Sequence, residues 1–269
     1  MMALKRILHL HSSFNLGGKD ARAVRLMNAM GDAARHVILS AEPAQMNACA
    51  AIAPGVDYAC PGDAAPALHG KPSPGRYWQL ARYFQGFDLL LSYNWGSMDA
   101  VMAHRMLSPF MTLPPIIHHE DGFNEDERVR RNWKRDGFRR LALPTVYRLV
   151  VPSATLAAVA RDGWGQPAAR IAEIPNGIAV DRYATEPAPG SLPGFVRRPG
   201  EVLVGTLAGL RAVKNLPMLV RAVAQAGPHV RLAIVGEGPE RGAIEAEAAR
   251  LGISGRLILP GFLPEPHRY

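Results

Sequence analysis

The chain has only two cysteines, Cys49 and Cys60, in 269 residues. They form no C-x-x-C motif, and no group of cysteines and histidines has the spacing of zinc ligands. We therefore expect no metal site, and we interpret the two cysteines as ordinary thiols of a cytoplasmic protein.

Long hydrophobic runs are also absent. No apolar stretch approaches the roughly 20 residues that a helix needs to span a bilayer. The first residues, MMALKRILHLH, contain Lys5 and Arg6 but no extended apolar region after them, so we do not expect a signal peptide. These absences favour a cytoplasmic globular protein, either free or held at the inner face of a membrane.

Acidic residues are in the minority. The chain has 31 Lys and Arg against 23 Asp and Glu, which gives a formal net charge of +8. Such a balance favours an anionic partner: a phosphorylated small molecule, a membrane surface or nucleic acid. The densest basic run, residues 128–140, has few aromatic side chains to stack on bases, so we do not expect nucleic acid. We interpret this run as a solvated helix face or, second, as a contact with an anionic membrane.

Short apolar runs recur along the chain and alternate with segments of helical periodicity. Most runs are too continuous for half-exposed antiparallel strands and predict buried parallel strands. Leu216, Leu219, Val220 and Val223 follow the spacing of an amphipathic helix. The alternation predicts an α/β protein with two parallel sheets. The expected strands span residues 6–10, 36–40, 88–92, 115–119, 148–151, 171–174, 202–207, 230–235 and 256–260.

Three junctions between an expected strand and an expected helix could hold phosphate. At the first, a strand ends near His11, and Gly17 and Gly18 precede the helix. Two glycines let a ligand approach the backbone, and a helix N-terminus attracts anions, although a tight turn explains the pair equally well. The spacing is not G-x-G-x-x-G and no acidic residue follows at a second strand end, so NAD is not indicated.

The second junction follows the strand at 202–207. Its loop carries Arg211 and Lys214, Asn215 is placed to cap the next helix, and Pro217 suits the first helical turn. Two cations beside a helix N-terminus suit a diphosphate. The alternative is two ordinary surface cations.

The third junction follows the strand at 230–235. That strand ends at Gly236, and Glu237, Gly238 and Pro239 form the turn into an Ala/Glu-rich helix. Three such junctions in one chain predict a nucleoside diphosphate bound at the carboxyl ends of parallel strands.

Several segments together resemble a known family. IPNGIAVDRY, VGTLAGLRAVKN and IVGEGPERGAIEAEAARLGISGRLILPGF resemble the GT-B glycosyltransferases of family 4, a family of retaining enzymes, and NLGGKDARAVRLMNAM and IIHHEDGF fit the N-terminal half of the same family. The resemblance implies two Rossmann-like, doubly wound parallel-sheet domains: an acceptor-binding domain at 1–170 and a nucleotide-sugar-binding domain at 171–269. Composition alone would place the linker in the Pro/Gly-rich stretch 186–200, which the resemblance makes a loop of the second domain.

The resemblance also implies catalytic roles. Lys214 matches a lysine that contacts the donor diphosphate. Arg211 is similar to its cationic companion, although many members carry that arginine nearer the strand, where this chain has Gly209. His118 matches a histidine near the transferred sugar, with a strand-capping role as the alternative, and His119 should point to the opposite face of the strand.

Binding roles follow from the same resemblance. Gly17 and Gly18 match a loop whose amides face the donor phosphates, and Gly236 to Pro239 resembles the loop near the nucleoside. Asn176 belongs to a turn at the start of the second domain and either contacts the donor or is structural. Glu120 and Asp121 are candidates for binding an acceptor hydroxyl, with simple solvation as the alternative.

One family motif is not found in the sequence. The acidic pair E-x7-E, which holds the donor sugar and ribose in the family, should follow LPGFLPEPHRY by a few tens of residues, and the sequence ends at Tyr269. We therefore expect the second domain to be incomplete and the 269-residue chain to have little or no transferase activity.

The implied reaction moves a sugar from a nucleoside diphosphate sugar to a hydroxyl of a saccharide or lipid-linked acceptor, with retention and without a metal or other cofactor. Such enzymes serve polysaccharide, glycolipid or cell-envelope biosynthesis. Arg211 and Lys214 would stabilise the charge that builds on the leaving diphosphate. The alternatives are a nucleotide-sugar epimerase of the same architecture and a non-catalytic nucleotide-sugar-binding module.

Overall fold

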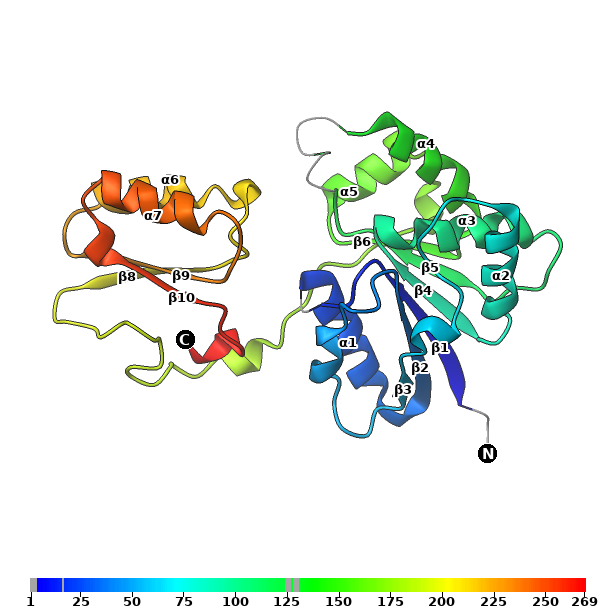
Figure 1. Cartoon of the computed structure of the whole chain (residues 1–269), viewed down its shortest axis with the longest axis horizontal. Helices are drawn as coiled ribbons and strands as arrows, with labels where there is room; N and C mark the ends of the chain where they lie inside the picture. Colours follow the sequence, from blue (N-terminus) through cyan, green and yellow to red (C-terminus); the bar gives the residue numbers. More distant parts are fainter. Residues whose placement is uncertain (1–3, 16, 124–126, 128–130) are drawn as a thin grey trace. The chain divides into compact units, whose positions relative to one another are not determined.

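The computed structural model describes residues 4–15, 17–123, 127 and 131–269. The chain divides into two compact units, Met1–Gly177 and Ile178–Tyr269, here called the first and the second unit. Figure 1 shows the two units, each built on its own parallel sheet.

The first unit is built on a parallel sheet with the strand order β3-β2-β1-β4-β5-β6-β7. The first strand of the chain lies near the middle, and the order reverses between β1 and β4, which both pair in parallel. In open sheets of this kind ligands bind outside the carboxyl ends of the strands at such a reversal. The strands are β1 (Lys5–His11), β2 (Ala34–Ser40), β3 (Tyr58–Ala59), β4 (Leu89–Tyr93), β5 (Ile116–His119), β6 (Arg148–Val151) and β7 (Ile171–Glu173).

Helices cover both faces of this sheet, so the strands are buried on both sides. Ile7 of β1 packs in one hydrophobic cluster with Ala23 and Met27 of α1. Leu8, which points to the other face, packs in a second cluster with side chains of α2, α3, α4 and α5. This burial on both faces explains why the apolar runs are continuous rather than alternating. The helices are α1 (Gly18–Met30), α2 (Pro74–Phe84), α3 (Met98–Leu107), α4 (Trp133–Ala142) and α5 (Ala154–Ala158).

The second unit has a smaller parallel sheet with the order β10-β9-β8. Helices α6 (Leu216–Gln225) and α7 (Arg241–Arg250) lie together on one face, as Figure 1 shows, and share a hydrophobic cluster with β9. Leu192 and Phe195 pack against the other face. The strands are β8 (Val202–Leu207), β9 (Val230–Val235) and β10 (Leu257–Gly261).

The chain divides after Gly177, a few residues beyond the predicted boundary between 170 and 171. The reason is β7, which pairs with β6 and therefore belongs to the first sheet. The stretch 186–200 lies inside the second unit, as the family resemblance implied. The binding roles assigned to the two domains stay predictions. In the described part of the chain, no helix is long and apolar enough to cross a membrane.

Candidate functional site

In the second unit, the loops that follow β8 and β9 are joined by backbone hydrogen bonds. The amide of Leu210 donates to the carbonyl of Glu237 at 2.8 Å, and the amide of Glu240 donates to the carbonyl of Leu210 at 3.0 Å. The second and third predicted junctions therefore form one surface at the carboxyl ends of two neighbouring strands.

Two glycines make this close approach possible. Gly236 and Gly238 have φ values of 142° and 154°, which side chains rarely allow. A Cβ atom on Gly236 would lie 2.0 Å from the carbonyl oxygen of Ala208, and one on Gly238 would lie 2.4 Å from that of Leu210. The packing between the loops therefore requires glycine at both positions, while Glu237 and Pro239 between and after them are exposed.

Arg211 and Lys214 project from the first of these two loops. Both side chains are exposed, and among the described residues neither has a hydrogen-bond or ion-pair partner. The pairing of the loops fixes the backbone that carries them. Two cations with no carboxylate partner beside a glycine loop form a surface that can bind a diphosphate.

The local helix starts differ in part from the sequence prediction. Asn215 occupies the N-cap position of α6 as predicted, but it has a left-handed conformation, with φ 48°, and its side chain makes no capping hydrogen bond. Pro217 does lie in the first turn of α6. Pro239 precedes α7 and does not belong to its first turn, because the helix begins at Arg241.

In the first unit, His118 is fully buried at the end of β5. Its Nδ1 lies 2.9 Å from the hydroxyl of Ser92 on the neighbouring strand, and its Nε2 lies 3.5 Å from Glu120. His119 points to the other face of the sheet, as predicted, and it stacks on Tyr93 with a ring separation of 4.8 Å. In this arrangement His118 holds the strand end, and its predicted proximity to the transferred sugar stays a prediction.

Glu120 is fully buried in an ionic network around Arg139 of α4. Arg139 Nε donates to Glu120 at 3.1 Å, and its guanidinium also lies 3.5 Å from Glu127 and stacks over Trp164. Burial and the ion pair keep this carboxylate from solvent, so the alternative of simple solvation does not apply. The predicted contact of Glu120 with an acceptor hydroxyl stays a prediction. The ion pair links the loop after β5 to α4.

The same network changes the interpretation of the basic run 128–140. Residues 128–130 lie outside the described part of the chain. Of the others, Arg135 contacts Glu127 at 2.9 Å, Arg131 contacts Asp136 at 3.6 Å and Arg139 is fully buried. Carboxylates thus compensate these three cations, while Lys134 and Arg140 of the same run are exposed. The contact with an anionic membrane stays a prediction.

Gly17 caps α1 and Gly18 begins it, at the carboxyl end of β1. Neither has a positive φ, and a Cβ on Gly17 would find no atom nearer than 3.8 Å. The chain's own packing therefore does not demand these glycines. Lys19, which sequence reasoning missed, folds over the preceding loop and donates to Ser12 Oγ at 3.0 Å.

Asp121 follows Glu120 but is partly exposed. It forms an ion pair with Arg22 of α1 at 2.6 Å, and the same guanidinium donates to Asn176 at 2.9 Å. The structure thus brings Asp121 and Asn176, predicted to bind different substrates, to one arginine that the sequence did not single out. Their contacts with acceptor and donor stay predictions.

Several histidines are buried on the α1 face of the sheet. His9 Nε2 lies 3.0 Å from His36, His9 Nδ1 lies 3.2 Å from the Tyr93 hydroxyl, and His11 Nδ1 lies 3.1 Å from Asp20. Burial lowers the pKa of His9 and His11 well below the ordinary value and raises the pKa of Asp20 to about 6. Among the described residues, no group of three or more potential ligands is placed to hold a metal ion.

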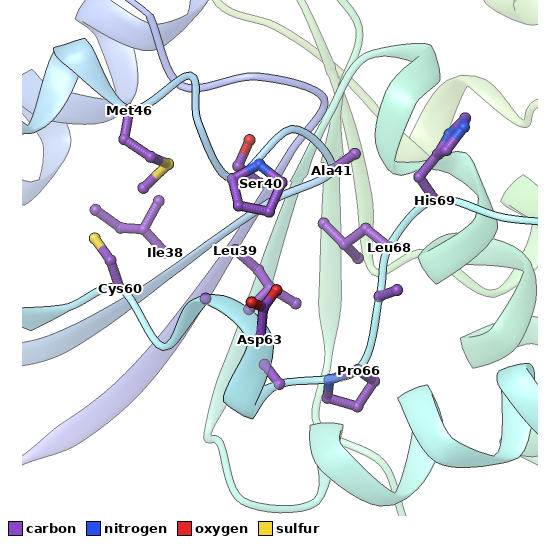
Figure 2. Close-up of a pocket in the computed structure, with 14 residues that line it drawn as sticks. Ile38, Leu39, Ser40, Ala41, Met46, Cys60, Asp63, Pro66, Leu68 and His69 are labelled. Atoms are coloured by element: carbon purple, nitrogen blue, oxygen red, sulfur yellow. The ribbon is translucent and has the colours of Figure 1, made fainter.

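A cavity of about 400 Å³ opens at the carboxyl end of β2. Figure 2 shows Met46, Ile38 and Cys60 at one end of it and Leu68 and His69 at the other. No sequence pattern predicts this cavity, because most of its lining residues come from the connection between positions 41 and 69 rather than from β2. The polar groups among its lining residues include Ser40, Asp63 and His69.

Comparison with known proteins decides the family. The family model described as Glycosyltransferase Family 4 matches residues 17–182, which is more than half of the chain. The chain belongs to glycosyltransferase family 4. The resemblance found in the sequence motifs is thereby confirmed.

Several solved structures share the fold. Anabaena Alr3699/HepE in complex with UDP superposes with a TM-score of 0.73 at 18% identity, over 98% of this chain and 71% of that one. The lipopolysaccharide outer core galactosyltransferase WaaB gives a TM-score of 0.62 at 14% identity, over 97% and 69%. The α/β architecture with two parallel sheets is therefore that of the GT-B enzymes.

Two further relatives either cover less of this chain or superpose with a lower TM-score. A 2-deoxystreptamine glucosyltransferase of Streptomyces kanamyceticus is 30% identical over 99 residues, which is 34% of this chain and 25% of that enzyme, so the match spans a quarter of that relative's length. A UDP-N-acetylglucosamine 2-epimerase gives a TM-score of 0.54 at 13% identity, over 99% of this chain and 72% of that one. The epimerase alternative thus shares the fold, but the family match favours the glycosyltransferases.

Proposed function

We propose that this protein transfers a sugar from a nucleoside diphosphate sugar to an acceptor hydroxyl, with retention of configuration, in the synthesis of a polysaccharide, glycolipid or other cell-envelope component. The observation that carries the proposal is the pair of joined loops after β8 and β9, which carries two exposed cations without a carboxylate partner in the described part of the chain. Family membership supports the same conclusion, and a UDP complex is known for the similar Anabaena protein.

The donor diphosphate would bind over this loop pair. Its charge of about two would be met by the Arg211 guanidinium and the Lys214 ammonium, and the N-termini of α6 and α7 would add positive potential. When the bond between sugar and phosphate breaks, negative charge grows on the leaving diphosphate. Cations that are already in place stabilise this charge more than they stabilise the ground state, and this difference lowers the barrier.

The chemistry proposed here needs no metal at the diphosphate, because the two side chains carry the positive charge that a divalent cation would otherwise supply. A front-face route, in which the departing phosphate takes the proton of the acceptor hydroxyl, fits retention without a protein nucleophile. No carboxylate of the loops after β8 and β9 is assigned a nucleophilic role in this proposal.

The acceptor has two candidate positions in the first unit. The cavity beside β2 has apolar walls and a carboxylate, Asp63, among its polar groups, which suits a hydroxylated molecule with an apolar part. Asp121 is the other candidate, since its side chain keeps 17% exposure although its carboxylate oxygens are covered, and Arg22 orients it. We propose Asp121 rather than Glu120 as the acidic residue that meets an acceptor hydroxyl.

The test is a transfer assay on the full-length gene product with Lys214→Ala. We expect turnover to fall at least about tenfold while the fold is retained, since one lost charge-assisted contact in the transition state costs several kcal/mol. Arg197→Ala is the matched control, because Arg197 is an exposed cation of the second unit before the start of β8.

Product analysis with and without acceptor completes the test. If the protein converted the nucleotide sugar to its epimer without acceptor, the proposed transferase activity would be wrong and the protein would be an epimerase. Equal turnover in Lys214→Ala and the wild type would remove the proposed role of the cation.

A further inference from the structure

The two cysteines, which are distant from any motif, meet in the folded chain. Cys49 lies in the short helical turn Asn47–Ala51, and Cys60 directly follows β3. Their Sγ atoms are 3.6 Å apart, and both thiols are free. The full sequence contains no other cysteine, so any disulfide within one chain must join these two residues.

The pair stands at the wall of the cavity beside β2. Cys60 lines this cavity, and Figure 2 shows its sulfur near Met46 and Ile38. Met46 immediately precedes the turn that carries Cys49. Chemistry at the two sulfurs therefore acts on two adjoining segments of the cavity wall.

We propose that Cys49 and Cys60 form a reversible disulfide by exchange with small disulfides such as glutathione disulfide, and that this bond fixes the adjoining wall of the cavity. One cysteine thiolate attacks the small disulfide and releases the first small thiol, which leaves a mixed disulfide on the protein. The second cysteine sulfur then attacks the protein sulfur of that mixed disulfide and expels the second small thiol. The two cysteines are oxidised, and the small disulfide is reduced to two thiols.

The geometry makes the intramolecular step favourable. The two sulfurs must approach from 3.6 Å to about 2.0 Å. Cys60 can supply much of this movement because β3 has only two residues and forms the edge of the sheet, paired to β2 alone. Since the cysteines are only 11 positions apart and already in contact, the second step competes well with reversal of the first.

The exchange should be slow at neutral pH. Although Cys60 is an exposed residue, partial desolvation of its sulfur and the contact with Cys49 raise the pKa of the Cys60 thiol to about 12, so little of it is thiolate at pH 7. A higher pH increases the thiolate fraction, and we expect the rate of oxidation to rise steadily between pH 7 and pH 9.

The experiment treats the reduced protein with glutathione disulfide at pH 8.5 and follows its intact mass and peptide map. We expect one intramolecular disulfide, seen as the loss of two hydrogens and a cross-linked peptide pair, and its reversal by dithiothreitol. Hydrogen exchange should slow in residues 46–63 of the oxidised form. These readouts need no substrate, so they stand or fall separately from the transferase proposal.

Cys49→Ser and Cys60→Ser are the matched controls. Each leaves one thiol, and we expect only a glutathione adduct or a dimer and no slowing of exchange in residues 46–63. The proposal would be overturned if the wild type gave only glutathione adducts or cross-linked dimers, or kept both thiols free. An intramolecular disulfide that leaves hydrogen exchange of the cavity wall unchanged would overturn its second half.

Discussion

The close packing of the loops after β8 and β9 predicts that Gly238→Ala destabilises the second unit. Gly238 has φ 154°, and its missing Cβ would lie 2.4 Å from the carbonyl oxygen of Leu210. Alanine therefore cannot keep both the conformation and the contact. We expect the loops to separate and to lose the two hydrogen bonds that join Leu210 to Glu237 and Glu240.

The expected loss of stability follows from these contacts. Each lost hydrogen bond costs about 1 kcal/mol, and the unfavourable backbone conformation costs a further 1–3 kcal/mol or so. The free energy of unfolding of the second unit should therefore fall by about 3–5 kcal/mol. Gly242→Ala is the matched control: it lies in α7 with open space around it, and alanine should stabilise the helix by up to about 1 kcal/mol.

Hydrogen exchange of β8 and β9 under native conditions measures this effect within the second unit, and urea unfolding gives the total. UDP binding should weaken together with stability in Gly238→Ala and stay intact in Gly242→Ala. If Gly238→Ala unfolded within about 0.5 kcal/mol of the wild type and bound UDP equally well, the described packing of the loops would be refuted.

The remaining predictions concern the first unit. Arg139→Met should cost about 3–5 kcal/mol in urea unfolding, because it leaves buried carboxylates without their partner; a loss below 1 kcal/mol or so would contradict the ionic network. Burial lowers the pKa of His9 and lowers that of His119 to about 3 in the folded protein. As the pH drops below 6.5, these histidines are protonated in the unfolded chain but not in the folded one, so Tm should fall. The raised pKa of Asp20, about 6, offsets part of this loss; a Tm that rises on acidification from pH 7 to 5 would exclude the buried neutral histidines. Gly17→Ala should leave Tm unchanged, since its Cβ would meet no atom nearer than 3.8 Å, and should weaken donor binding only if phosphate lies over this glycine.

Much of the fold is predictable from apolar runs, because a strand that is buried on both faces has apolar residues at consecutive positions. The run Val202–Leu207 predicts β8 with both ends correct, and the run 230–235 does the same for β9. Strand β3 (Tyr58–Ala59) has no such apolar run. It is a strand only because it pairs with β2. The chain divides a few residues beyond the predicted domain boundary because the short strand β7 joins the first sheet, which its residue types do not indicate.

The sequence predicts the parts of the candidate site that require glycine in the backbone. It does not predict contacts between side chains that are far apart in the sequence. The glycines at 236 and 238 predict a close approach of another group to the backbone, and in the structure the loop after β8 packs against them. The acidic loop after β5 shows its charges but not their partners, because Arg139 reaches Glu120 from a helix 19 positions away. The meeting of Cys49 and Cys60 is equally invisible, since only tertiary packing brings the two loops together.

The central claim is that Arg211 and Lys214 bind a diphosphate at the carboxyl ends of β8 and β9. Isothermal titration of the protein with UDP, GDP and ADP tests it most directly, alongside Lys214→Ala and the double variant with Arg211→Ala. We predict binding of at least one nucleotide, an affinity loss of roughly tenfold or more for Lys214→Ala and a larger loss for the double variant, because charge-assisted contacts contribute about 1.5–3 kcal/mol each. Absence of binding by all three nucleotides, or equal affinity in the double variant, would contradict the claim.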